Sequence, residues 1–184
     1  MDQAGDDITV SHERVMTVMF TDIRGFSTLA EHMDAKDIAD LLNRHFQLLS
    51  SCIEAEGGTI DKFIGDSVMA FWGAPEQIPD HAERALRAAR AIQRAVIADN
   101  RRRRETGEPI LAARAGLYTG PVVVGNIGSL SRVNYTVVGD TVNVASRIEA
   151  LSKDLVSAGS GAEDDCTVFF RTATGGIAER GIRG

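Results

Sequence analysis

The sequence predicts an α+β fold, in which a mixed or antiparallel sheet is packed with helices in the ferredoxin-like arrangement. Short apolar runs rich in β-branched residues alternate with longer segments whose apolar residues recur at helical spacing. Several strand-like runs follow one another across tight-turn residues, so neighbouring strands should run in opposite directions. We therefore expect one sheet with its helices on one face.

The first half of the chain supplies a strand, a helix and a hairpin. Residues 15–20 form an apolar run that predicts a buried strand. The segment 35–58 has apolar residues at helical spacing, and its two final glycines end the helix. Two strand-like runs, 59–64 and 67–73, flank the Gly-Asp pair at 65–66, which is typical of a tight hairpin turn.

The second half repeats this alternation. Asp80 is the predicted cap of a helix over residues 81–104, whose apolar stripe is mainly alanine and isoleucine. Two strands joined by a turn at Gly120 and Pro121, a third strand and another helix follow, over residues 111–120, 121–128, 134–138 and 141–153. The tail contains a small-residue loop and two strand candidates, at residues 156–165, 166–170 and 176–184.

The composition indicates one self-sufficient globular domain. The chain has 184 residues, 43% of them hydrophobic, and a formal net charge of −6. A chain of this length buries roughly 70% of its extended surface, so it needs neither disulfides nor metal to form a core. No run approaches the roughly 18 apolar residues of a membrane span, and the acidic start is unlike a signal peptide, so we expect a cytoplasmic location. We expect residues 1–13 to be a flexible linker remnant and residues 14–184 to form the domain.

Two aspartates are the first candidates for chemistry. Asp22 comes directly after the first predicted strand, and Asp66 lies in the predicted hairpin turn. In a ferredoxin-like sheet these segments are neighbours, so the two carboxylates should converge. Carboxylates without His or Cys nearby are the ligands that Mg²⁺ and Mn²⁺ prefer, and a pair of such ions suits in-line phosphoryl transfer. The alternative is that Asp66 only forms the turn and Asp22 only caps a helix.

A possible phosphate cradle follows Asp22 at once. Gly25, Phe26 and Ser27 begin a predicted helix. The N-terminus of a helix offers free N–H groups and a partial positive charge, and glycine lets a phosphate approach closely. The sequence therefore predicts a phosphate contact beside the two carboxylates.

Asn143 and Arg147 form a polar pair on one helix. Their i, i+4 spacing places them on the same face, away from the apolar residues that the helix offers to the core. Arginine suits a planar contact to phosphate, and asparagine can orient a hydroxyl or a ring oxygen. The alternative is an ordinary solvated helix face.

Lys62 and Thr136 each lie in a predicted strand. An ammonium can satisfy the acceptor N1 of adenine, whereas guanine carries a hydrogen there and would require a carboxylate. The threonine hydroxyl can accept a hydrogen bond from an exocyclic amino group. Such polar matching gives strong discrimination between bases, because the wrong base leaves buried groups unpaired.

The arginine run at 101–104 does not indicate a nucleic-acid partner. It ends a long predicted helix, where the helix dipole favours cations. The chain is acidic overall, and no aromatic residues are interleaved with the arginines. We therefore expect no nucleic acid among the partners.

Four motifs occur in order: FTDIRGFS, DKFIGDSVMAFWG, GLYTGPVVVGNIG and YTVVGDTVNVASRIE. Together they resemble the catalytic domain of class III nucleotidyl cyclases, the adenylyl and guanylyl cyclases, over residues 15–153. The resemblance implies a ferredoxin-like core that works as a homodimer with its active sites at the interface. It also implies an adenylate cyclase, which converts ATP into 3′,5′-cyclic AMP and pyrophosphate.

The resemblance also implies roles for individual residues around the triphosphate. Asp22, Asp66 and the backbone carbonyl of Ile23 match the ligands of two Mg²⁺ or Mn²⁺ ions. The segment 25–27 matches the stretch that wraps the triphosphate. Arg180 loosely matches a late basic residue that contacts the terminal phosphates.

Four further residues match the groups that contact the nucleoside and the α-phosphate. Lys62 matches the base-contacting lysine of the adenylyl type, where guanylyl cyclases typically have glutamate. Thr136 stands where many members have aspartate, and a threonine there resembles the subgroup that responds to bicarbonate. Asn143 matches the residue that orients the ribose, and Arg147 the residue that stabilises the α-phosphate in the transition state.

Some features depart from the family pattern. Pro121 follows Gly120 where some members have a phosphate-contacting arginine, and Arg183 is the alternative to Arg180 for the terminal phosphates. The family usually continues with one more strand, so we expect the C-terminal strand to be truncated. The alternative functions are a guanylate cyclase and a catalytically silent nucleotide-binding module. Regulatory domains are expected outside this chain.

Overall fold

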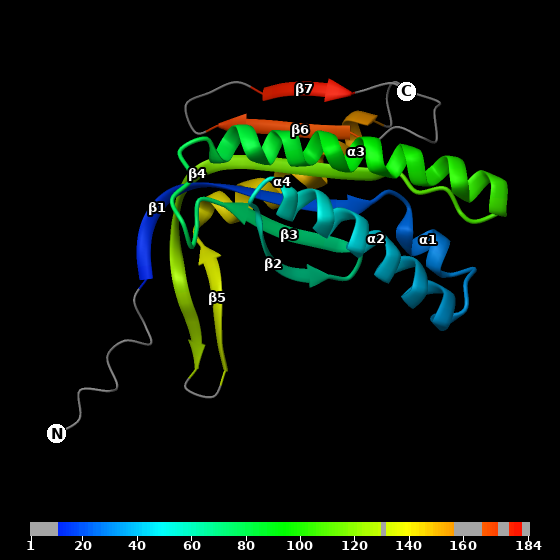
Figure 1. Ribbon diagram of the computed structural model, residues 1–184, viewed down its shortest axis with the longest axis horizontal. Coiled ribbons are helices and arrows are strands. Elements are labelled where there is room, and N and C mark those ends of the chain that lie inside the picture. The colour runs from blue at the N-terminus through cyan, green and yellow to red at the C-terminus, as the bar shows by residue number, and fades with distance from the viewer. Residues whose placement is uncertain (1–10, 130–131, 157–166, 173–176, 182–184) are drawn as a thin grey trace.

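The computed structural model describes residues 11–129, 132–156, 167–172 and 177–181, and it confirms the α+β class (Figure 1). A sheet runs through the middle of the molecule, with helices packed against it. The elements in chain order are β1 (Ser11–Ile23), α1 (Phe26–Ala30), α2 (Ala35–Ala55), β2 (Thr59–Ile64), β3 (Ser67–Trp72), α3 (His81–Thr106), β4 (Ala113–Ser129), β5 (Arg132–Val138), α4 (Asp140–Val156), β6 (Thr167–Thr172) and β7 (Ile177–Gly181).

The strands follow the order β2-β3-β1-β4-β6-β7, with β5 paired to β4. β4 and β6 are parallel, whereas the other pairs are antiparallel, so the sheet is mixed as predicted. The predicted hairpin is confirmed: Ile64 pairs with Ser67, and Gly65 between β2 and β3 has a φ of 60°, which favours glycine. β1 and β4 lie at the centre of the sheet.

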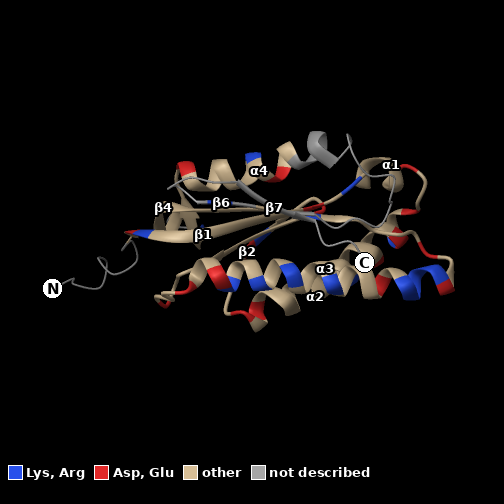
Figure 2. Ribbon diagram, turned by 90° about the horizontal axis from the view of Figure 1, so that it is seen from above, with Lys and Arg blue, Asp and Glu red and all other residues tan. Residues whose placement is uncertain are grey.

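The helices cover both faces of the sheet, so the prediction of helices on one face was wrong (Figure 2). α2 and α3 pack on one face and α4 on the other. β1 explains the difference, because its apolar residues alternate: Met19 joins the α2/α3 cluster, while Met16 and Val18 join the α4 cluster. A strand that is apolar on both sides needs cover on both sides. Among the described helices, none has the length and apolar composition that a membrane crossing requires.

β4 is one long strand, so the predicted turn at Gly120 and Pro121 was wrong. Both residues continue the pairing with β1, opposite Met16 and Val15. On its other side, β4 pairs with β6 only up to Thr119 and with β5 only from residue 123. The Gly-Pro step lies in this gap, where β4 is locally an edge, and an edge is where a sheet tolerates proline.

Several other boundaries also moved. β1 begins at Ser11, which pairs with Gly125, so residues 11–13 belong to the sheet and not to the linker remnant. The two strand candidates of the tail correspond to β6 and β7. Val156 ends α4, and the rest of the predicted loop, residues 157–165, lies outside the described residues.

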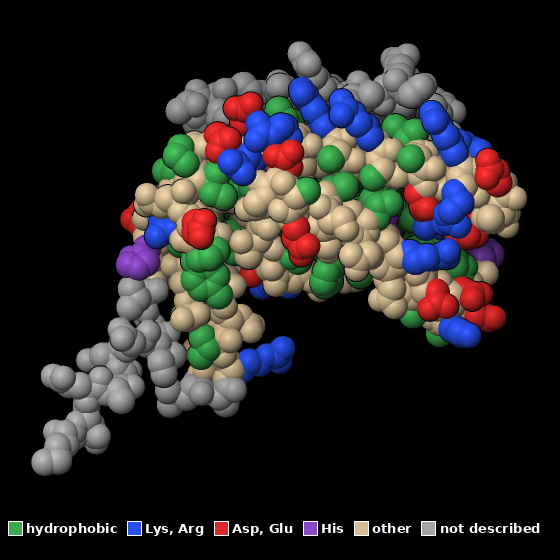
Figure 3. Space-filling view, viewed as in Figure 1, with side chains coloured by type: hydrophobic (Ala, Val, Ile, Leu, Met, Phe, Trp, Pro, Cys, Tyr) green, Lys and Arg blue, Asp and Glu red, His purple; other side chains and the backbone are tan. Residues whose placement is uncertain are grey.

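The arginine run at the end of α3 is used within the chain. Arg102 bonds Asp99 at 3.0 Å and Glu108 at 2.6 Å. Arg103 is almost fully buried and bonds the other oxygen of Asp99 at 2.6 Å. Basic and acidic side chains accordingly lie side by side at this end of the molecule, on the right of Figure 3. These contacts tie the helix to the segment that leads into β4.

Candidate active site

The structure brings Asp22 and Asp66 together at one end of the sheet. β1 pairs with β3, with Phe20 opposite Met69, so the last residues of β1 lie beside the turn that holds Asp66. The N–H of Ile23 donates to Oδ2 of Asp66 at 3.0 Å. Asp22 is the second-to-last residue of β1, whereas the prediction placed it directly after the strand.

Burial and the neighbouring Asp22 carboxylate both act on Asp66. Burial is the main cause that raises the pKa of Asp66 to about 6, and a hydrogen bond with Asp22 and the charge of Asp22 raise it further. The hydrogen bond from the Ile23 N–H acts in the opposite direction. Two carboxylates that repel each other in a half-buried place attract a cation, because the cation removes the repulsion.

A buried arginine completes this cluster. Arg114 of β4 is the register partner of Asp22 and donates from Nη2 to Oδ2 of Asp22 at 2.5 Å. Its Nε lies 3.8 Å from Oε1 of Glu149 on α4. The interior thus contains a chain of alternating charges that runs from Asp22 through Arg114 to α4.

The donor set fits a hard divalent cation. Asp22, Asp66 and the backbone of Ile23 offer only oxygen ligands, the kind that Mg²⁺ and Mn²⁺ prefer. In the described part of the chain no group of three or more His, Cys, Asp or Glu side chains gathers to hold a metal.

The segment after Asp22 turns as predicted. Gly25 has a φ of 68° and immediately precedes α1, and its Cα faces open space. Phe26 and the apolar side of α1 pack against Ile23, which holds the turn in place. Ser27 is exposed. The backbone of this turn is therefore accessible beside the two carboxylates, while its contact with phosphate stays a prediction.

α4 is fixed to β4 at two points. A Cβ on Gly116 would lie 2.3 Å from the backbone nitrogen of Glu149, and one on Gly120 would lie 2.6 Å from Oγ1 of Thr141. The Thr141 hydroxyl also donates to the carbonyl of Pro121 at 2.7 Å. The eight helical steps between the two contacts span about 12 Å, and the four strand steps between the two glycines span about 13 Å. The two glycines thus match the rise of the helix.

This placement turns the predicted polar pair outward. Thr141, Ala145 and Glu149 recur every four residues and are buried against the sheet. Asn143 and Arg147 lie two residues away from them, on the opposite side of α4, and both are exposed. Their common exposed face is confirmed.

The two base-contacting candidates lie on different strands that are not neighbours in the sheet. Lys62 of β2 has a 48% exposed side chain, and its Nζ is 3.1 Å from Oδ2 of Asp61, whose side chain is only 2% exposed. Thr136 of β5 is buried, and its Oγ1 has no hydrogen-bond partner. The ammonium is therefore accessible to a ligand, whereas the Thr136 hydroxyl is unpartnered but buried.

The remaining predicted site residues lie on β2, β5, α4 and β7. Among the described residues, Lys62, Thr136 and the α4 pair make no hydrogen bond or ion pair with the two aspartates. Arg180 lies in β7 opposite Val168, and its side chain is outside the described part.

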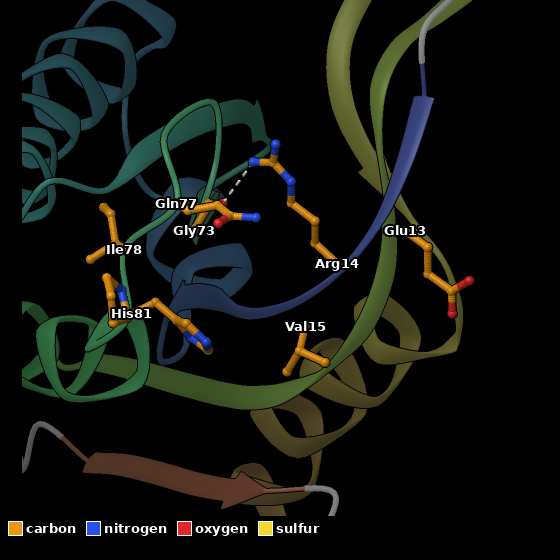
Figure 4. A pocket seen from close by; sticks show the side chains of 8 residues that line it. Glu13, Arg14, Val15, Gly73, Gln77, Ile78 and His81 are labelled. Atoms are coloured by element: carbon orange, nitrogen blue, oxygen red, sulfur yellow. Dashed lines mark hydrogen bonds between the residues drawn. The ribbon is translucent and has the colours of Figure 1, made fainter.

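A cavity of about 310 Å³ lies at the opposite end of β1 from Asp22 (Figure 4). Arg14, which bonds the carbonyl of Gly73, and His81 of α3 lie on its wall. None of the predicted site residues lines it. The cavity is therefore separate from the carboxylate cluster.

Comparison with known proteins identifies the family. A model of the adenylate and guanylate cyclase catalytic domain matches residues 8–157. The chain belongs to this family. The cyclase domain is 44% identical over 139 residues to Adenylate cyclase 1 of Rhizobium meliloti (strain 1021), which covers 76% of the chain. The match takes in 21% of that relative, so the chain spans about a fifth of its length.

Solved structures resemble the cyclase domain over most of its length. The adenylyl cyclase CyaB from P. aeruginosa has a TM-score of 0.76 and 34% identity, over 88% of this chain and 79% of that one. The guanylyl cyclase Cya2 has a TM-score of 0.74 and 34% identity, over 87% of each chain. The chain therefore has the fold of cyclase catalytic domains, as the sequence predicted.

Three charged residues beside the predicted site residues were not predicted from the sequence. Arg114 bonds Asp22, Glu149 forms an ion pair with Arg114, and Asp61 forms one with Lys62. For Arg114 a signal was present: it is the one charged residue in the strand-like run LAARAGLYTG, and a charge at a buried strand position requires a partner. The identity of that partner was not accessible without the strand register.

Proposed function

We propose that this cyclase domain is an adenylate cyclase, which converts ATP into 3′,5′-cyclic AMP and pyrophosphate. The observation that carries the proposal is the pairing of Asp22 with Asp66 beside the open turn at Gly25. The adenylate cyclase relative at 44% identity supports the same activity.

The reaction is an intramolecular phosphoryl transfer. The 3′-oxygen of the ribose attacks the α-phosphorus in line, the bond to the bridging oxygen breaks, and pyrophosphate leaves while the hydroxyl proton passes to solvent. Asp22, Asp66 and the Ile23 carbonyl would hold two Mg²⁺ or Mn²⁺ ions. When bound, such ions lower the pKa of the ribose hydroxyl and offset the charge of the leaving group.

The exposed face of α4 acts on the nucleotide. Arg147 places a guanidinium against the oxygens of the α-phosphate, where negative charge develops in the transition state. By analogy with the loss of an oxyanion-hole donor, this contact is worth about 3 kcal/mol. Asn143 on the same face orients the ribose.

Base selection rests on Lys62 and Thr136. Lys62 donates to N1 of adenine, and the buried carboxylate of Asp61 limits the directions in which the ammonium can point. The unpartnered hydroxyl of Thr136 accepts from the exocyclic amino group. Guanine presents a donor at N1, which leaves the ammonium without an acceptor.

The complete site requires a second copy of the chain. The aspartates belong to one subunit, and Lys62, Thr136 and the α4 pair belong to the other, so a homodimer has two sites. The paired strands β4 and β5 extend from the sheet (Figure 1). They expose apolar side chains that a partner can cover. These are Val123, Val133, Tyr135 and Val138, each 37–43% exposed.

A guanylate cyclase is the second candidate, and the likeness to the guanylyl cyclase Cya2 supports it. Lys62 favours ATP over GTP for the reason given above. A catalytically silent nucleotide-binding module is the third candidate. The filled metal, ribose and α-phosphate positions count against it, because a silent module has no need of them.

The test incubates the purified chain with ATP or GTP and Mn²⁺ and measures both cyclic nucleotide and pyrophosphate. We expect cyclic AMP from the wild type and at least a 100-fold loss, by analogy with other catalytic groups, in Asp22→Asn. Asp40→Asn, on the exposed surface of α2, is the matched control and should retain activity. No cyclic product from either nucleotide would refute the enzyme function.

A second experiment tests base selection. Lys62→Glu should lower the ATP rate sharply and shift the preference towards GTP, while the exposed Lys36→Glu should change neither. An unchanged ratio of ATP to GTP turnover would show that Lys62 does not contact the base.

Other features of the proposal concern regulation and the ends of the chain. Thr136 suggests a response to bicarbonate, which the same assay measures with and without added bicarbonate. The length of the R. meliloti relative favours regulatory domains outside this chain. The contacts of residues 25–27 and of Arg180 with the triphosphate, and a cytoplasmic location, stay predictions.

A further inference from the structure

Arg114 is a buried charge between two carboxylates on different elements. Its side chain is 6% exposed, and it lies against Asp22 at 2.5 Å and Glu149 at 3.8 Å. A buried guanidinium is stable only where its partners compensate the loss of solvation. One of those partners is Asp22, which belongs to the metal half of the site, that is, Asp22, Asp66 and the Ile23 carbonyl. The position of Arg114 therefore affects the position of a proposed metal ligand.

Backbone and side-chain donors fix the orientation of both aspartates. Oδ2 of Asp22 accepts from Arg114, and Oδ2 of Asp66 accepts from the Ile23 N–H. Each carboxylate thus has one oxygen held by the protein. A planar guanidinium fixes the plane of the carboxylate that it bonds, which a lysine ammonium does not do.

Glu149 faces Arg114 from the other side as an ion pair at 3.8 Å, a separation longer than a hydrogen bond. Its position is set by backbone packing, because the bare Cα of Gly116 lets the helix backbone at Glu149 approach β4 within contact distance. The register then places Arg114 two residues along the same strand, on the same face. The link from Asp22 through Arg114 to Glu149 therefore ends on the helix that carries Asn143 and Arg147.

We propose that Arg114 is a positioning residue for the metal half of the site: its guanidinium, oriented by Glu149, holds the Asp22 carboxylate in place for a divalent cation. The proposal rests on the proposed function only for the identity of that cation. It makes no use of the nucleotide, so cation binding can be measured separately from cyclisation.

The test is a titration of the full chain with Mn²⁺ alone, followed by electron paramagnetic resonance of free Mn²⁺. Outer partners of metal ligands typically change metal affinity 10- to 100-fold, so Arg114→Lys should weaken Mn²⁺ binding about tenfold. Glu149→Gln, which keeps the arginine but loosens it, should weaken binding about threefold. Asp22→Asn defines the signal that belongs to this site.

A simple counter-ion role predicts a different pattern. Arg114→Lys keeps the charge and would then leave Mn²⁺ affinity unchanged, while Arg114→Met removes a positive charge and would strengthen binding. Arg14→Lys is the matched control, because the Arg14 guanidinium bonds the backbone carbonyls of Gly73 and Pro75 at the end of β1 far from Asp22. It should leave Mn²⁺ affinity unchanged.

The outcomes separate the two proposals. Weaker Mn²⁺ binding in Arg114→Lys, with the fold retained by circular dichroism, supports positioning even if the wild type forms no cyclic nucleotide. If Arg114→Lys does not fold, Glu149→Gln decides. An affinity within about twofold of wild type in the folded variant, or wild-type Mn²⁺ binding that Asp22→Asn does not reduce, would overturn the positioning role.

Discussion

Replacing Gly116 by alanine displaces α4 and leaves every polar side chain unchanged. The new Cβ would lie 2.3 Å from the backbone nitrogen of Glu149 and 2.7 Å from its Cα, whereas real contacts of this kind begin near 3.0 Å. The clash is with backbone, so no side chain can rotate away, and α4 must move outward by at least about 0.7 Å. Overpacking of this kind lowers the free energy of unfolding by about 1–3 kcal/mol.

The effect on activity should exceed the effect on stability. Arg147 lies two residues before Glu149 on the same helix, so it moves with it, and a misplacement near 1 Å costs roughly 100-fold in rate. The assays are urea unfolding and initial rates of cyclic AMP formation. We expect a fully folded Gly116→Ala protein with a rate lowered by about one to two orders of magnitude.

Gly107→Ala is the control for stability loss alone. Gly107 has a φ of 70°, with open space around the position of its Cβ, at the end of α3. Its replacement strains the backbone by roughly 1–2 kcal/mol but leaves α4 in place. Equal rates in Gly107→Ala and Gly116→Ala at matched stability, or a wild-type rate in Gly116→Ala, would refute the close packing of α4 on β4.

Three further predictions concern stability. Burial is the first cause, and a neighbouring arginine the second, that lowers the pKa of His45 to about 4. Below its ordinary pKa of about 6.5, His45 takes up a proton in the unfolded chain but stays neutral in the folded one. The folded state therefore keeps its full stability above pH 6.5 and loses part of it as pH falls towards 4. Between pH 7.5 and 5 the wild type should lose about 2 kcal/mol more than His45→Leu by urea unfolding, and parallel losses would contradict this. The Asn100 side chain hydrogen-bonds both the N–H and the carbonyl of Leu111, at 3.0 and 2.7 Å. Asn100→Ala should therefore lower the free energy of unfolding by about 3 kcal/mol. A change under about 0.5 kcal/mol would argue against this buried pair of hydrogen bonds. A Cβ on Gly58 would lie 2.6 Å from Trp72, so Gly58→Ala should cost about 1–3 kcal/mol and alter the fluorescence of this single tryptophan, whose unchanged spectrum would contradict the contact.

Local sequence patterns predicted some features of the paired aspartates but not others. Asp66 was predictable because Gly65 and Asp66 form a hairpin turn, a structure that short-range backbone preferences set. Its meeting with Asp22 followed from the order of strands in a ferredoxin-like sheet. The bond from the Ile23 N–H and the raised pKa of Asp66 depend on the β1–β3 register and on burial, which no local pattern specifies.

The errors have physical causes of the same kind. The Gly-Pro step at 120–121 is a strong local turn signal, but continuous pairing with β1 keeps the strand extended. The apolar residues of β1 alternate between two clusters on opposite faces, which predicts a strand buried on both sides but does not say which helices cover it.

The sequence on its own settles what lies close along the chain: the helices and strands, the hairpin turn, the exposed polar face of α4, and the motifs that identify the cyclase family. These depend on periodicity, turn chemistry and residue type, all of which act over a few residues. Only the tertiary structure decides that Arg114 reaches Asp22 and Glu149, and that Gly116 and Gly120 fit the rise of α4. The reason is that these contacts join residues far apart in the chain: Thr141 and Pro121 are 20 positions apart, and Asp22 and Arg114 are 92 apart. Only strand register and helix packing bring such residues together.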